Sequence, residues 1–463
     1  MTLIKSISGI RGTIGGAVGE NLTPIDTVKF AAAYGSWIKQ QRNKENYRVV
    51  VGRDARISGE MIQELVMQTL VGMGIHVVDV GLSTTPTVEI AVTEEHADGG
   101  IILTASHNPK QWNALKLLDS KGEFLNDTEG KKILEFAQAE DFKFAEVDFL
   151  GEITKNDAYI DIHIDMVLDL PLVNEKAIKA ANFKVVVDAV NSTGGIAIPL
   201  LLERLGVHTV KLYCTPNGEF PHNPEPLKEH LGEISKLVVK EQADLGIVVD
   251  PDVDRLALIS ENGEMFGEEY TLVACADYVL SKTPGNTVSN MSSSRALRDV
   301  TEKHGGTYQA SAVGEVNVVQ MMKDTQAVIG GEGNGGIIYP ESHYGRDALV
   351  GIALFLSLLA EKKQKVSELR ASYPSYFMSK KKIQLTEGLD VDGLLQKMET
   401  KYTGEKITTI DGVKIDFPEN WVHLRKSNTE PIIRIYTEAK TQEIADALAD
   451  RFITEINGLV TGQ

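Results

Sequence analysis

Apolar strands alternate with helices along most of the chain, and this alternation constrains the fold more than any other feature. The pattern occurs three times, and each time it ends in an apolar strand that runs into an unusual polar loop: TASHNP (104–109), DPDVDR (250–255) and GEGNGG (331–336). Strands separated by single helices predict right-handed crossovers and mostly parallel sheets. Because ligands of open α/β sheets bind beyond the carboxyl ends of the strands, we expect the three loops to face one cleft.

The elements of the first unit follow from the hydrophobic pattern and from helix start and stop signals. Ser58 is expected to be the N-cap of a helix, and Gly74 is expected to end that helix. The predicted elements are helices at 29–41, 58–74 and near 87–97 and strands at 47–52, 75–81 and 99–106. We predict the same alternation for 183–252 and for 268–333.

The longest apolar run of the chain is Ala348–Ala360. It is shorter than the roughly 20 residues that span a bilayer, so we predict a buried helix at 347–363. Beyond it, SYPSYF (372–377) has the composition of a linker. The remainder is predicted to contain strands, a hairpin at Asp411-Gly412 and a final helix.

With 463 residues, the chain is long enough for three or four domains. We predict an α/β protein of three consecutive mixed α/β domains with mostly parallel sheets and a smaller C-terminal α+β domain, arranged around a central cleft. The predicted domains are 1–153, 154–256, 257–370 and 371–463, and each carries one polar loop.

The net charge of −18 and the isoelectric point near 5.1 oppose nonspecific binding to nucleic acid or to an anionic membrane, so we expect neither partner. An anionic small molecule would have to be bound by clustered Arg and Lys side chains. Two cysteines, Cys214 and Cys275, are too few for a disulfide framework and are predicted to be reduced thiols packed in cores. The first residues, MTLIKSISGIRG, lack the apolar stretch of a signal peptide, so we expect a cytoplasmic protein.

The loop DPDVDR places carboxylates at every second position, in Asp250, Asp252 and Asp254. In an extended segment they would project on the same side, because the strand period is two. Three crowded carboxylates repel unless a cation neutralises them, and oxygen ligands select a hard ion such as Mg²⁺. The alternative is a solvated acidic turn. The spacing does not fit an EF-hand, and Asp254 stands where a haloacid-type phosphatase would have Thr.

Ser106 stands at the end of a predicted buried strand, where its hydroxyl would be free and its backbone fixed. Ser106 could also be only a capping or solvated serine. No Gly-x-Ser-x-Gly elbow surrounds it, which disfavours activation of the hydrolase type.

Two further loops carry groups that suit a sugar phosphate. Glu332 and Asn334 can bind vicinal sugar hydroxyls, although GEGNGG could also be only a turn. The loop RKSNTEPIIR (425–434) combines cations with hydroxyl and amide donors, which suit a dianionic phosphate. Its candidate phosphate ligands are Arg425, Ser427, Asn428, Thr429 and Arg434.

Together these loops resemble the α-D-phosphohexomutase family, which includes phosphoglucomutases, phosphomannomutases and phosphoglucosamine mutases. The resemblance covers essentially the whole chain. Within the family, the chain is most similar to the archaeal-type phosphoglucosamine mutase branch. The motifs that carry it are SGIRG (8–12), VGRDARISGE (51–60), STTPT (83–87), TASHNP (104–109), PNGEFPHNPEP (216–226), DPDVDR (250–255), GEGNGG (331–336) and RKSNTEP (425–431).

The resemblance implies a heart-shaped, four-domain enzyme with one loop per domain around a deep cleft. Ser106 would carry the phosphoryl group, and the three aspartates would hold one Mg²⁺ per chain together with a phosphoserine oxygen. Glu332 and Asn334 would bind the sugar, and the loop at 425–434 would bind the phosphate that is not being transferred.

Four more residues are implied in catalysis. Arg255 and Arg11 are candidates to steady the moving phosphoryl group, and His107 follows the serine directly. Lys116 resembles the lysine of the family that handles the proton of the sugar hydroxyl. We expect its pKa to be depressed by a cationic, partly desolvated pocket.

The sequence departs from the family pattern at two positions. Asn113 is followed by Ala114 where relatives have Gly, and Gly336 stands where many relatives have a histidine that is a proposed proton acceptor. Either Lys116 or a residue such as His343 would have to take over that role.

The function predicted from these residues is interconversion of hexosamine or hexose 6- and 1-phosphates through a phosphoserine and a bound hexose 1,6-bisphosphate. Glucosamine phosphate is the favoured substrate, and mannose or glucose phosphate is the alternative. A Mg²⁺-dependent phosphatase that uses the same serine and a non-catalytic sugar-phosphate binder are the rival classes. We expect a monomer or a homodimer.

Overall fold

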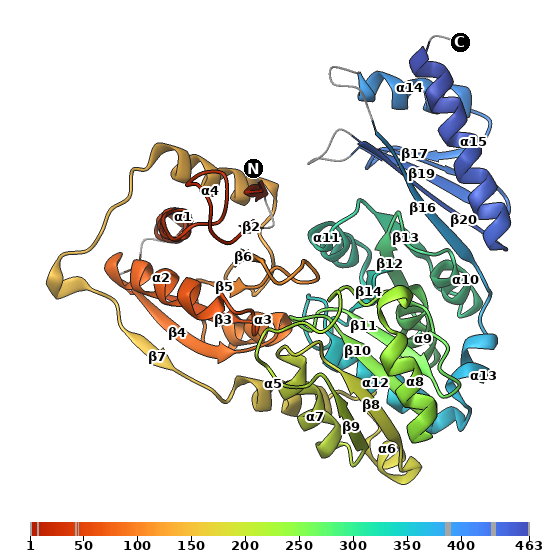
Figure 1. Ribbon diagram of the computed structural model, residues 1–463, viewed down its shortest axis with the longest axis horizontal. Coiled ribbons are helices and arrows are strands. Elements are labelled where there is room, and N and C mark those ends of the chain that lie inside the picture. The colour runs from red at the N-terminus through yellow and green to blue at the C-terminus, as the bar shows by residue number, and fades with distance from the viewer. Residues whose placement is uncertain are drawn as a thin grey trace.

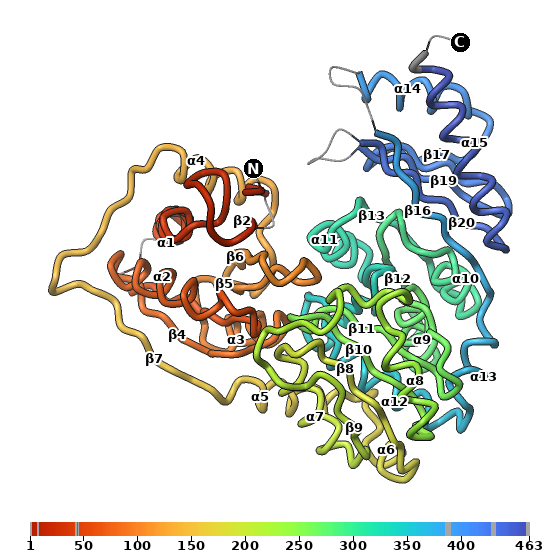
Figure 2. Tube along the Cα trace, in the orientation of Figure 1, coloured from red at the N-terminus to blue at the C-terminus, as the bar shows by residue number. Residues whose placement is uncertain are grey.

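The computed structural model describes residues 2–6, 9–41, 44, 46–384, 390–426 and 432–461, and these residues form four sheets. The sheets follow one another along the chain, and Figure 1 shows the C-terminal sheet on the opposite side of the molecule from the first. The chain passes through the four units in order, as the colour of the trace in Figure 2 shows. Three of the sheets are mixed and the C-terminal one is antiparallel, which confirms the predicted fold class.

The first sheet has the order β1-β2-β6-β5-β3-β4-β7. Its strands β5, β3, β4 and β7 are parallel, whereas β1, β2 and β6 pair antiparallel. Half of the strand pairings in this sheet are therefore antiparallel, a larger share than the sequence pattern predicted. The elements of this unit are β1 (Ile4–Ser6), β2 (Gly9–Thr13), α1 (Pro24–Gln41), β3 (Tyr47–Arg53), α2 (Gly59–Gly72), β4 (Ile75–Leu82), α3 (Thr85–Glu94), β5 (Gly99–Leu103), β6 (Trp112–Leu118), α4 (Asp127–Ala139), the 3₁₀ turn η1 (Val147–Phe149) and β7 (Ile153–Lys155).

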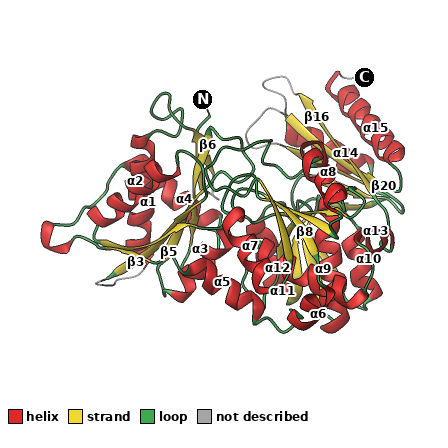
Figure 3. Ribbon diagram, turned by 60° about the horizontal axis from the view of Figure 1, so that its bottom comes forward, coloured by secondary structure: helices red, strands yellow, loops and turns green. Residues whose placement is uncertain are grey.

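Alternation along β3 explains why this sheet is buried on both faces. Val49 and Val51 pack into one core with helices α1, α2 and α4, while Val50 between them packs against α3. Figure 3 shows the strands of this sheet as a layer between helices. The apolar run that predicted a buried strand at 47–52 is therefore confirmed.

Ser58 is not a side-chain cap. Its backbone is already helical, with φ −79° and ψ −5°, and its side chain caps no backbone N–H of α2. Its hydroxyl instead accepts from Asn113 Nδ2 at 3.0 Å. The prediction of Gly74 as the stop is confirmed, since α2 ends at Gly72 and Gly74 adopts φ +72°.

The second sheet has the order β11-β10-β8-β9, with β11 antiparallel and the others parallel. Because β11 begins at Leu256 and pairs fully with β10, this sheet extends past residue 256, where we predicted a domain boundary. Its elements are α5 (Tyr159–Leu168), α6 (Glu175–Ala181), β8 (Lys184–Asp188), α7 (Gly194–Arg204), β9 (His208–Leu212), η2 (Lys228–His230), α8 (Gly232–Glu241), β10 (Leu245–Val249) and β11 (Leu256–Ser260).

The third sheet has the order β13-β12-β14-β15, with only β15 antiparallel. Its unit contains the helix α12, which the apolar run predicted correctly and which lies buried in the core shared by the second and third units. The elements are α9 (Glu268–Lys282), β12 (Asn286–Asn290), α10 (Ala296–Lys303), β13 (Tyr308–Ser311), α11 (Glu315–Thr325), β14 (Ala327–Glu332), β15 (Gly336–Ile338), α12 (Ala348–Lys362) and α13 (Val366–Ala371).

The fourth sheet, in the order β16-β20-β19-β18-β17, packs one face against α14 and α15. The hairpin at Asp411-Gly412 is confirmed between β17 and β18, whereas the sequence pattern missed α14. The elements are β16 (Phe377–Gln384), α14 (Val391–Lys401), β17 (Lys406–Thr408), β18 (Val413–Asp416), β19 (Trp421–Lys426), β20 (Ile432–Ala439) and α15 (Gln442–Thr461).

Two sets of contacts hold the units together near the loops. In the first, the α3 residue Thr87 hydrogen-bonds His163 of α5 (2.9 Å), and His163 reaches Asp347 at the start of α12 (2.8 Å). In the second, Lys414 donates to the carbonyl of Met291 (2.7 Å), which ties the fourth sheet to the third. These buried contacts fix the loop-bearing ends of neighbouring sheets relative to one another.

Both cysteines are free thiols, as predicted, and Cys275 is buried while Cys214 is partly buried against the same core. Within the described ranges, no helix combines the length and the apolar character of a membrane span.

Candidate active site

Ser106 lies just beyond β5 in a left-handed conformation, with φ +47°. Its backbone N–H donates to Thr104 Oγ1 (2.9 Å), and its Oγ donates to Asp250 Oδ2 (2.7 Å). Positive φ is costly for a serine, so the surrounding contacts must hold it in place. The backbone is fixed as predicted, but the hydroxyl is not free: it bridges the first sheet to the loop of the second.

Arg56 holds the serine loop. It lies in the motif VGRDARISGE (51–60), but the motif does not show which backbone groups the side chain reaches, so this role was not predicted. Its guanidinium is buried and forms an ion pair with Asp54 at 3.0 Å. It also donates to the main-chain oxygens of four loop residues: Ser106, Asn108, Pro109 and Trp112. A single side chain therefore fixes the course of residues 106–112.

Asp250, Asp252 and Asp254 are fully buried, and one carboxylate oxygen from each lies within 4.8 Å of the others. The convergence was predicted, but the argument from strand period was wrong. The segment is a turn, in which Val253 adopts φ +64° and its N–H donates back to the carbonyl of Asp250 (3.1 Å). The turn, rather than an extended backbone, aims the carboxylates at one point.

The donor set fits a hard divalent cation. The Oδ1 atoms of Asp252 and Asp254 are buried and accept no hydrogen bond from any described residue. Burial and the two neighbouring carboxylates raise the pKa of Asp250 well above its usual range. A bound cation would supply the missing partner of these oxygens and keep Asp250 ionised, and all-oxygen ligation favours Mg²⁺ over zinc.

Lys116 extends from β6 into this cluster, with Nζ 2.7 Å from Asp252 Oδ2 and 3.4 Å from Asp254 Oδ2. We expected its pKa to be depressed, and this is wrong. Burial lowers the pKa, but Asp252 and Asp254 outweigh burial and raise it above the ordinary lysine value. In this arrangement Lys116 is an ammonium ion.

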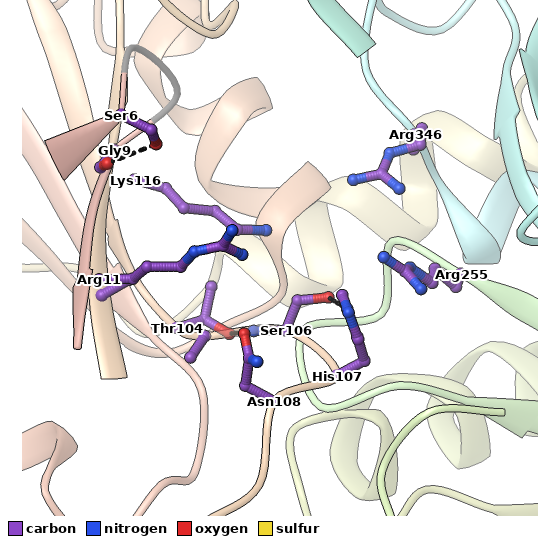
Figure 4. Close-up of a pocket in the computed structure, with 12 residues that line it drawn as sticks. Ser6, Gly9, Arg11, Thr104, Ser106, His107, Asn108, Lys116, Arg255 and Arg346 are labelled. Atoms are coloured by element: carbon purple, nitrogen blue, oxygen red, sulfur yellow. Dashed lines mark hydrogen bonds between the residues drawn. The ribbon is translucent and has the colours of Figure 1, made fainter. Parts of the chain in front are cut away.

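A cavity of about 150 Å³ lies in front of Ser106 and collects the predicted catalytic side chains. Figure 4 shows Arg11 and Lys116 reaching in from one side, while Arg255 and Arg346 reach in from the other. Arg11 comes from β2, and Arg255 directly follows the aspartate loop. Four cations around one small cavity suit a phosphate group, because guanidinium and ammonium groups form strong charge-assisted hydrogen bonds with it.

His107 also lines the cavity, with Nδ1 3.3 Å from Ser106 Oγ. Burial and the nearby Arg255 lower the pKa of His107 to about 2, so its ring is neutral. His343, the other histidine considered, lies outside the lining, with its two nitrogens 3.2 Å from carboxylates of Glu89 and Asp347. Despite burial, these partners raise the pKa of His343 to about 10, which disfavours His343 as a proton acceptor.

The sugar-loop residues lie beside the cavity rather than in its lining. Glu332 Oε1 accepts from Asn290 Nδ2 (2.8 Å) and from the N–H of Gly314 (3.3 Å). Asn334 Oδ1 accepts from the N–H of Gly336 (3.2 Å). Arg346, which the sequence analysis missed, links the two regions: it donates to Asp254 Oδ2 (2.7 Å) and lies 3.4 Å from Glu332 Oε2.

On the fourth sheet, three cations stand side by side on adjacent strands. Arg434 of β20 is opposite Arg425 of β19 and opposite Lys382 of β16. Arg425 pairs with Asp411 at 2.8 Å. Like charges directly opposite one another destabilise a sheet unless an anion neutralises them. Lys382 was not predicted, although the alternation in SKKKIQ places it on the face of Arg434.

Arg434 is close enough to the first unit to affect it, since burial and the charge of Arg434 lower the pKa of Arg11. The predicted ligands Ser427, Asn428 and Thr429 lie outside the described residues.

Comparison with known families gives matches along almost the whole chain. Residues 3–144, 161–263 and 267–376 match the α/β/α domains I, II and III of phosphoglucomutase/phosphomannomutase, and residues 361–455 match its C-terminal domain.

Relatives that match over nearly their full length belong to the same group of enzymes. The chain is 37% identical over 440 residues to a phosphoglucomutase/phosphomannomutase of Thermococcus kodakarensis, covering 94% of this chain and 95% of that protein. It is 33% identical to a phosphoglucosamine/phosphogalactosamine mutase of Sulfurisphaera tokodaii, covering 98% of each. A crystal structure of a phosphoglucomutase/phosphomannomutase family protein from Burkholderia thailandensis superposes with a TM-score of 0.85 at 25% identity, covering 99% of this chain and 98% of that one.

The aspartate cluster predicts a specific response to metal. Mg²⁺ should raise the thermal midpoint of unfolding of the wild-type protein, and EDTA should reverse the effect, since a ligand bound only by the folded state stabilises it by about 2.7 kcal/mol at a hundred times its Kd. In Asp250→Asn this rise should be lost. The midpoint of that variant in EDTA should stay close to that of the wild type, because the raised pKa of Asp250 already favours its neutral form when no cation is bound.

Asp188→Asn is the matched control, since Asp188 is an equally buried strand-end aspartate of the same sheet outside the cluster. It should keep the response to Mg²⁺. An undiminished response in Asp250→Asn would show that the cluster does not bind the metal.

Proposed function

Because the chain belongs to the phosphoglucomutase/phosphomannomutase family, and therefore to the phosphohexomutases, we propose that it converts glucosamine 6-phosphate to glucosamine 1-phosphate. The observation that carries the proposal is the bond from Ser106 Oγ to Asp250 (2.7 Å) in a cavity ringed by four cations. This arrangement can hold a phosphorylated serine, because the cations neutralise the phosphate and the aspartates offer a site for a divalent ion beside it.

In the proposed reaction, the phosphoryl group of phosphorylated Ser106 passes to the free hydroxyl of the bound sugar monophosphate. The sugar oxygen loses its proton and forms the new P–O bond, while Ser106 Oγ regains a hydroxyl proton. A bound 1,6-bisphosphate results. After it turns over in the cleft, its other phosphoryl group returns to Ser106, which restores the phosphoserine and leaves the isomeric monophosphate.

The residues around the cavity have separate parts in this proposal. Asp250, Asp252 and Asp254 would hold one Mg²⁺ per chain, and the ion when bound would neutralise their charge and polarise a phosphoryl oxygen. Arg11 and Arg255 would neutralise the phosphoryl group in transit. Lys116, which lies within hydrogen-bonding distance of Asp252 and Asp254, would stabilise negative charge on the oxygens between which the group moves.

The opposite end of the substrate would lie against the fourth unit. Arg425 and Arg434 of the predicted phosphate loop, with the adjacent Lys382, offer a cationic strip for the phosphate that is not transferred. Ser427, Asn428 and Thr429 complete the proposed phosphate site. The two free thiols, which suit a reducing compartment, support a cytoplasmic location.

The choice of an amino sugar rests on charge near the sugar loop. Among the described residues, Glu315 and Glu332 share one guanidinium, that of Arg346, so two acidic groups stand against one cation on this side of the cavity. An ammonium group on the sugar would be favoured there, since charge-assisted hydrogen bonds are roughly twice as strong as neutral ones. The phosphoglucosamine mutase names of several archaeal relatives support the same choice.

Neutral hexose phosphates are the second candidate. Glu332 already accepts two hydrogen bonds and lies beside Arg346, so its charge is partly balanced. It could then bind hydroxyls that glucose, mannose and glucosamine share. The 37% identical relative named phosphoglucomutase/phosphomannomutase supports this alternative.

The phosphoserine can be tested directly. Intact-mass analysis of wild-type protein after incubation with glucose 1,6-bisphosphate should show a species one phosphate heavier, which Ser106→Ala should lack together with mutase turnover. Ser6→Ala is the matched control, because Ser6 lines the same cavity and its hydroxyl donates to the carbonyl of Gly9 (2.8 Å). That variant should still be phosphorylated. Wild-type turnover in Ser106→Ala would rule out the serine as carrier.

The substrate is tested by comparing kcat/KM for glucosamine, glucose and mannose 6-phosphates. Glucosamine 6-phosphate should give the highest kcat/KM. Glu332→Gln should reduce the ratio of its kcat/KM to those of the neutral sugars by up to about 10- to 150-fold, the contribution of one hydrogen bond to a charged group. The exposed Glu341 of the same unit provides the control Glu341→Gln, which should leave the ratio unchanged. Equal or higher values for a neutral sugar would assign the enzyme to hexose phosphates.

A further inference from the structure

One guanidinium joins carboxylates from three separate segments. Arg346 Nη2 donates to Asp254 Oδ2 (2.7 Å), Nε donates to Glu315 Oε2 (2.9 Å), and Nη1 lies 3.4 Å from Glu332 Oε2. The backbone N–H of Arg346 also donates to Glu315 Oε1 (3.0 Å), so Glu315 holds both the main chain and the side chain in place. Only 8% of Arg346 is exposed, and that part lines the cavity in front of Ser106.

The glycine at 336 is fitted to this arginine. A Cβ added to Gly336 would lie 2.3 Å from Arg346 Cδ and 3.0 Å from its Cγ, well inside van der Waals contact. The backbone of Gly336 does not require glycine, because its φ is not in the left-handed region. Gly336 is therefore present for space: the volume that a side chain at 336 would occupy is filled by the stem of Arg346.

This geometry bears on the histidine that the family resemblance led us to expect at the position of Gly336. A histidine there would meet the stem of Arg346, so Arg346 could not keep its present position beside it. The neighbouring carboxylates raise the pKa of Arg346 further, despite its burial, and a guanidinium is not a proton acceptor in any case. In this chain, the space beside the backbone of Gly336 is therefore occupied by the side chain of a fixed cation, Arg346.

We propose that Arg346 is a positioning residue for phosphoryl transfer. It holds the carboxylate of Glu332 in the sugar loop at a fixed position relative to Asp254, and Gly336 leaves the space that the side chain of Arg346 occupies. The inference rests on the proposed function, in which Glu332 binds the sugar. Main-chain hydrogen bonds already join these loops. The N–H of Leu256 donates to the carbonyl of Gly335 (3.0 Å), and the N–H of Ala348 donates to the carbonyl of Val253 (3.2 Å). Arg346 adds the side-chain link, which orients the reacting groups.

A mutant cycle tests this pairing. Gly336→Ala should lower both the thermal midpoint and kcat, because its methyl group meets Arg346 Cδ. Arg346→Ala should lower kcat at least 10-fold with a smaller change in the midpoint, since Glu332 and Asp254 lose their common partner. In Gly336→Ala/Arg346→Ala the clash with Arg346 is gone and only the tight contact with Asn334 Oδ1 (3.1 Å) remains, so its thermal midpoint should exceed that of Gly336→Ala and its kcat should match that of Arg346→Ala. Gly232→Ala, at a glycine with nothing within 4 Å, is the control and should behave as wild type.

A positioning role is separated from a merely structural one by two further readouts. Arg346→Lys keeps the positive charge but not the planar guanidinium, and it should recover part of the kcat that Arg346→Ala loses. Arg346→Gln keeps part of the aliphatic stem without the charge and should recover none of it. If Arg346→Ala does not fold, Arg346→Gln replaces it in the comparison. Ser106 should still become phosphorylated by glucose 1,6-bisphosphate in all of these variants, although more slowly where Arg346 is replaced, because the other three cations of the cavity remain.

Wild-type kcat and KM in Arg346→Ala, or a double variant no more stable than Gly336→Ala, would overturn the inference. Failure of the proposed function would instead show as absence of mutase activity in the wild-type protein. The two failures are therefore distinguishable.

Discussion

The structure depends on one electrostatic constraint, the burial of three carboxylates at a single point. Two unit charges 4 Å apart repel by about 4 kcal/mol at an effective dielectric constant of 20, so the cluster of Asp250, Asp252 and Asp254 requires partners. The partners present come from elsewhere in the chain: the ammonium of Lys116, the guanidinium of Arg346 and the hydroxyl of Thr85, which donates to Asp252 at 2.6 Å. Each of these contacts fixes the end of another sheet or helix against the cluster.

This constraint explains why a chain of four units gives one site. Thr85 begins α3 of the first unit, and its N–H also donates to the carbonyl of Asp252 (2.8 Å). Arg346 precedes α12 of the third unit, and Ser106 closes the contact from the first sheet. The loops at the carboxyl ends of the first three sheets therefore meet through buried polar bonds. The fourth unit contributes its cations from the open face of an antiparallel sheet.

Local patterns predicted much of this arrangement. Apolar runs identified the buried strands and α12, and the spacing of acidic residues identified the cluster, although a turn and not an extended segment brings the carboxylates together. Residues that act through distant partners could not be found in this way. Arg56 binds carbonyl groups about fifty residues away along the chain, and Arg346 binds Asp254 from another unit. The pKa of Lys116 was misjudged for the same reason, because the sequence does not show which carboxylates surround an amine.

The central claim, that this site transfers a phosphoryl group between sugar hydroxyls, is tested most directly by following that group. The protein is phosphorylated on Ser106 with ³²P-labelled glucose 1,6-bisphosphate, freed of excess label, mixed with unlabelled hexosamine monophosphate and quenched within milliseconds to seconds. The account predicts that label leaves the protein for sugar phosphates at least as fast as steady-state turnover. Release of the label as inorganic phosphate at that rate would contradict it and identify the protein as a phosphatase.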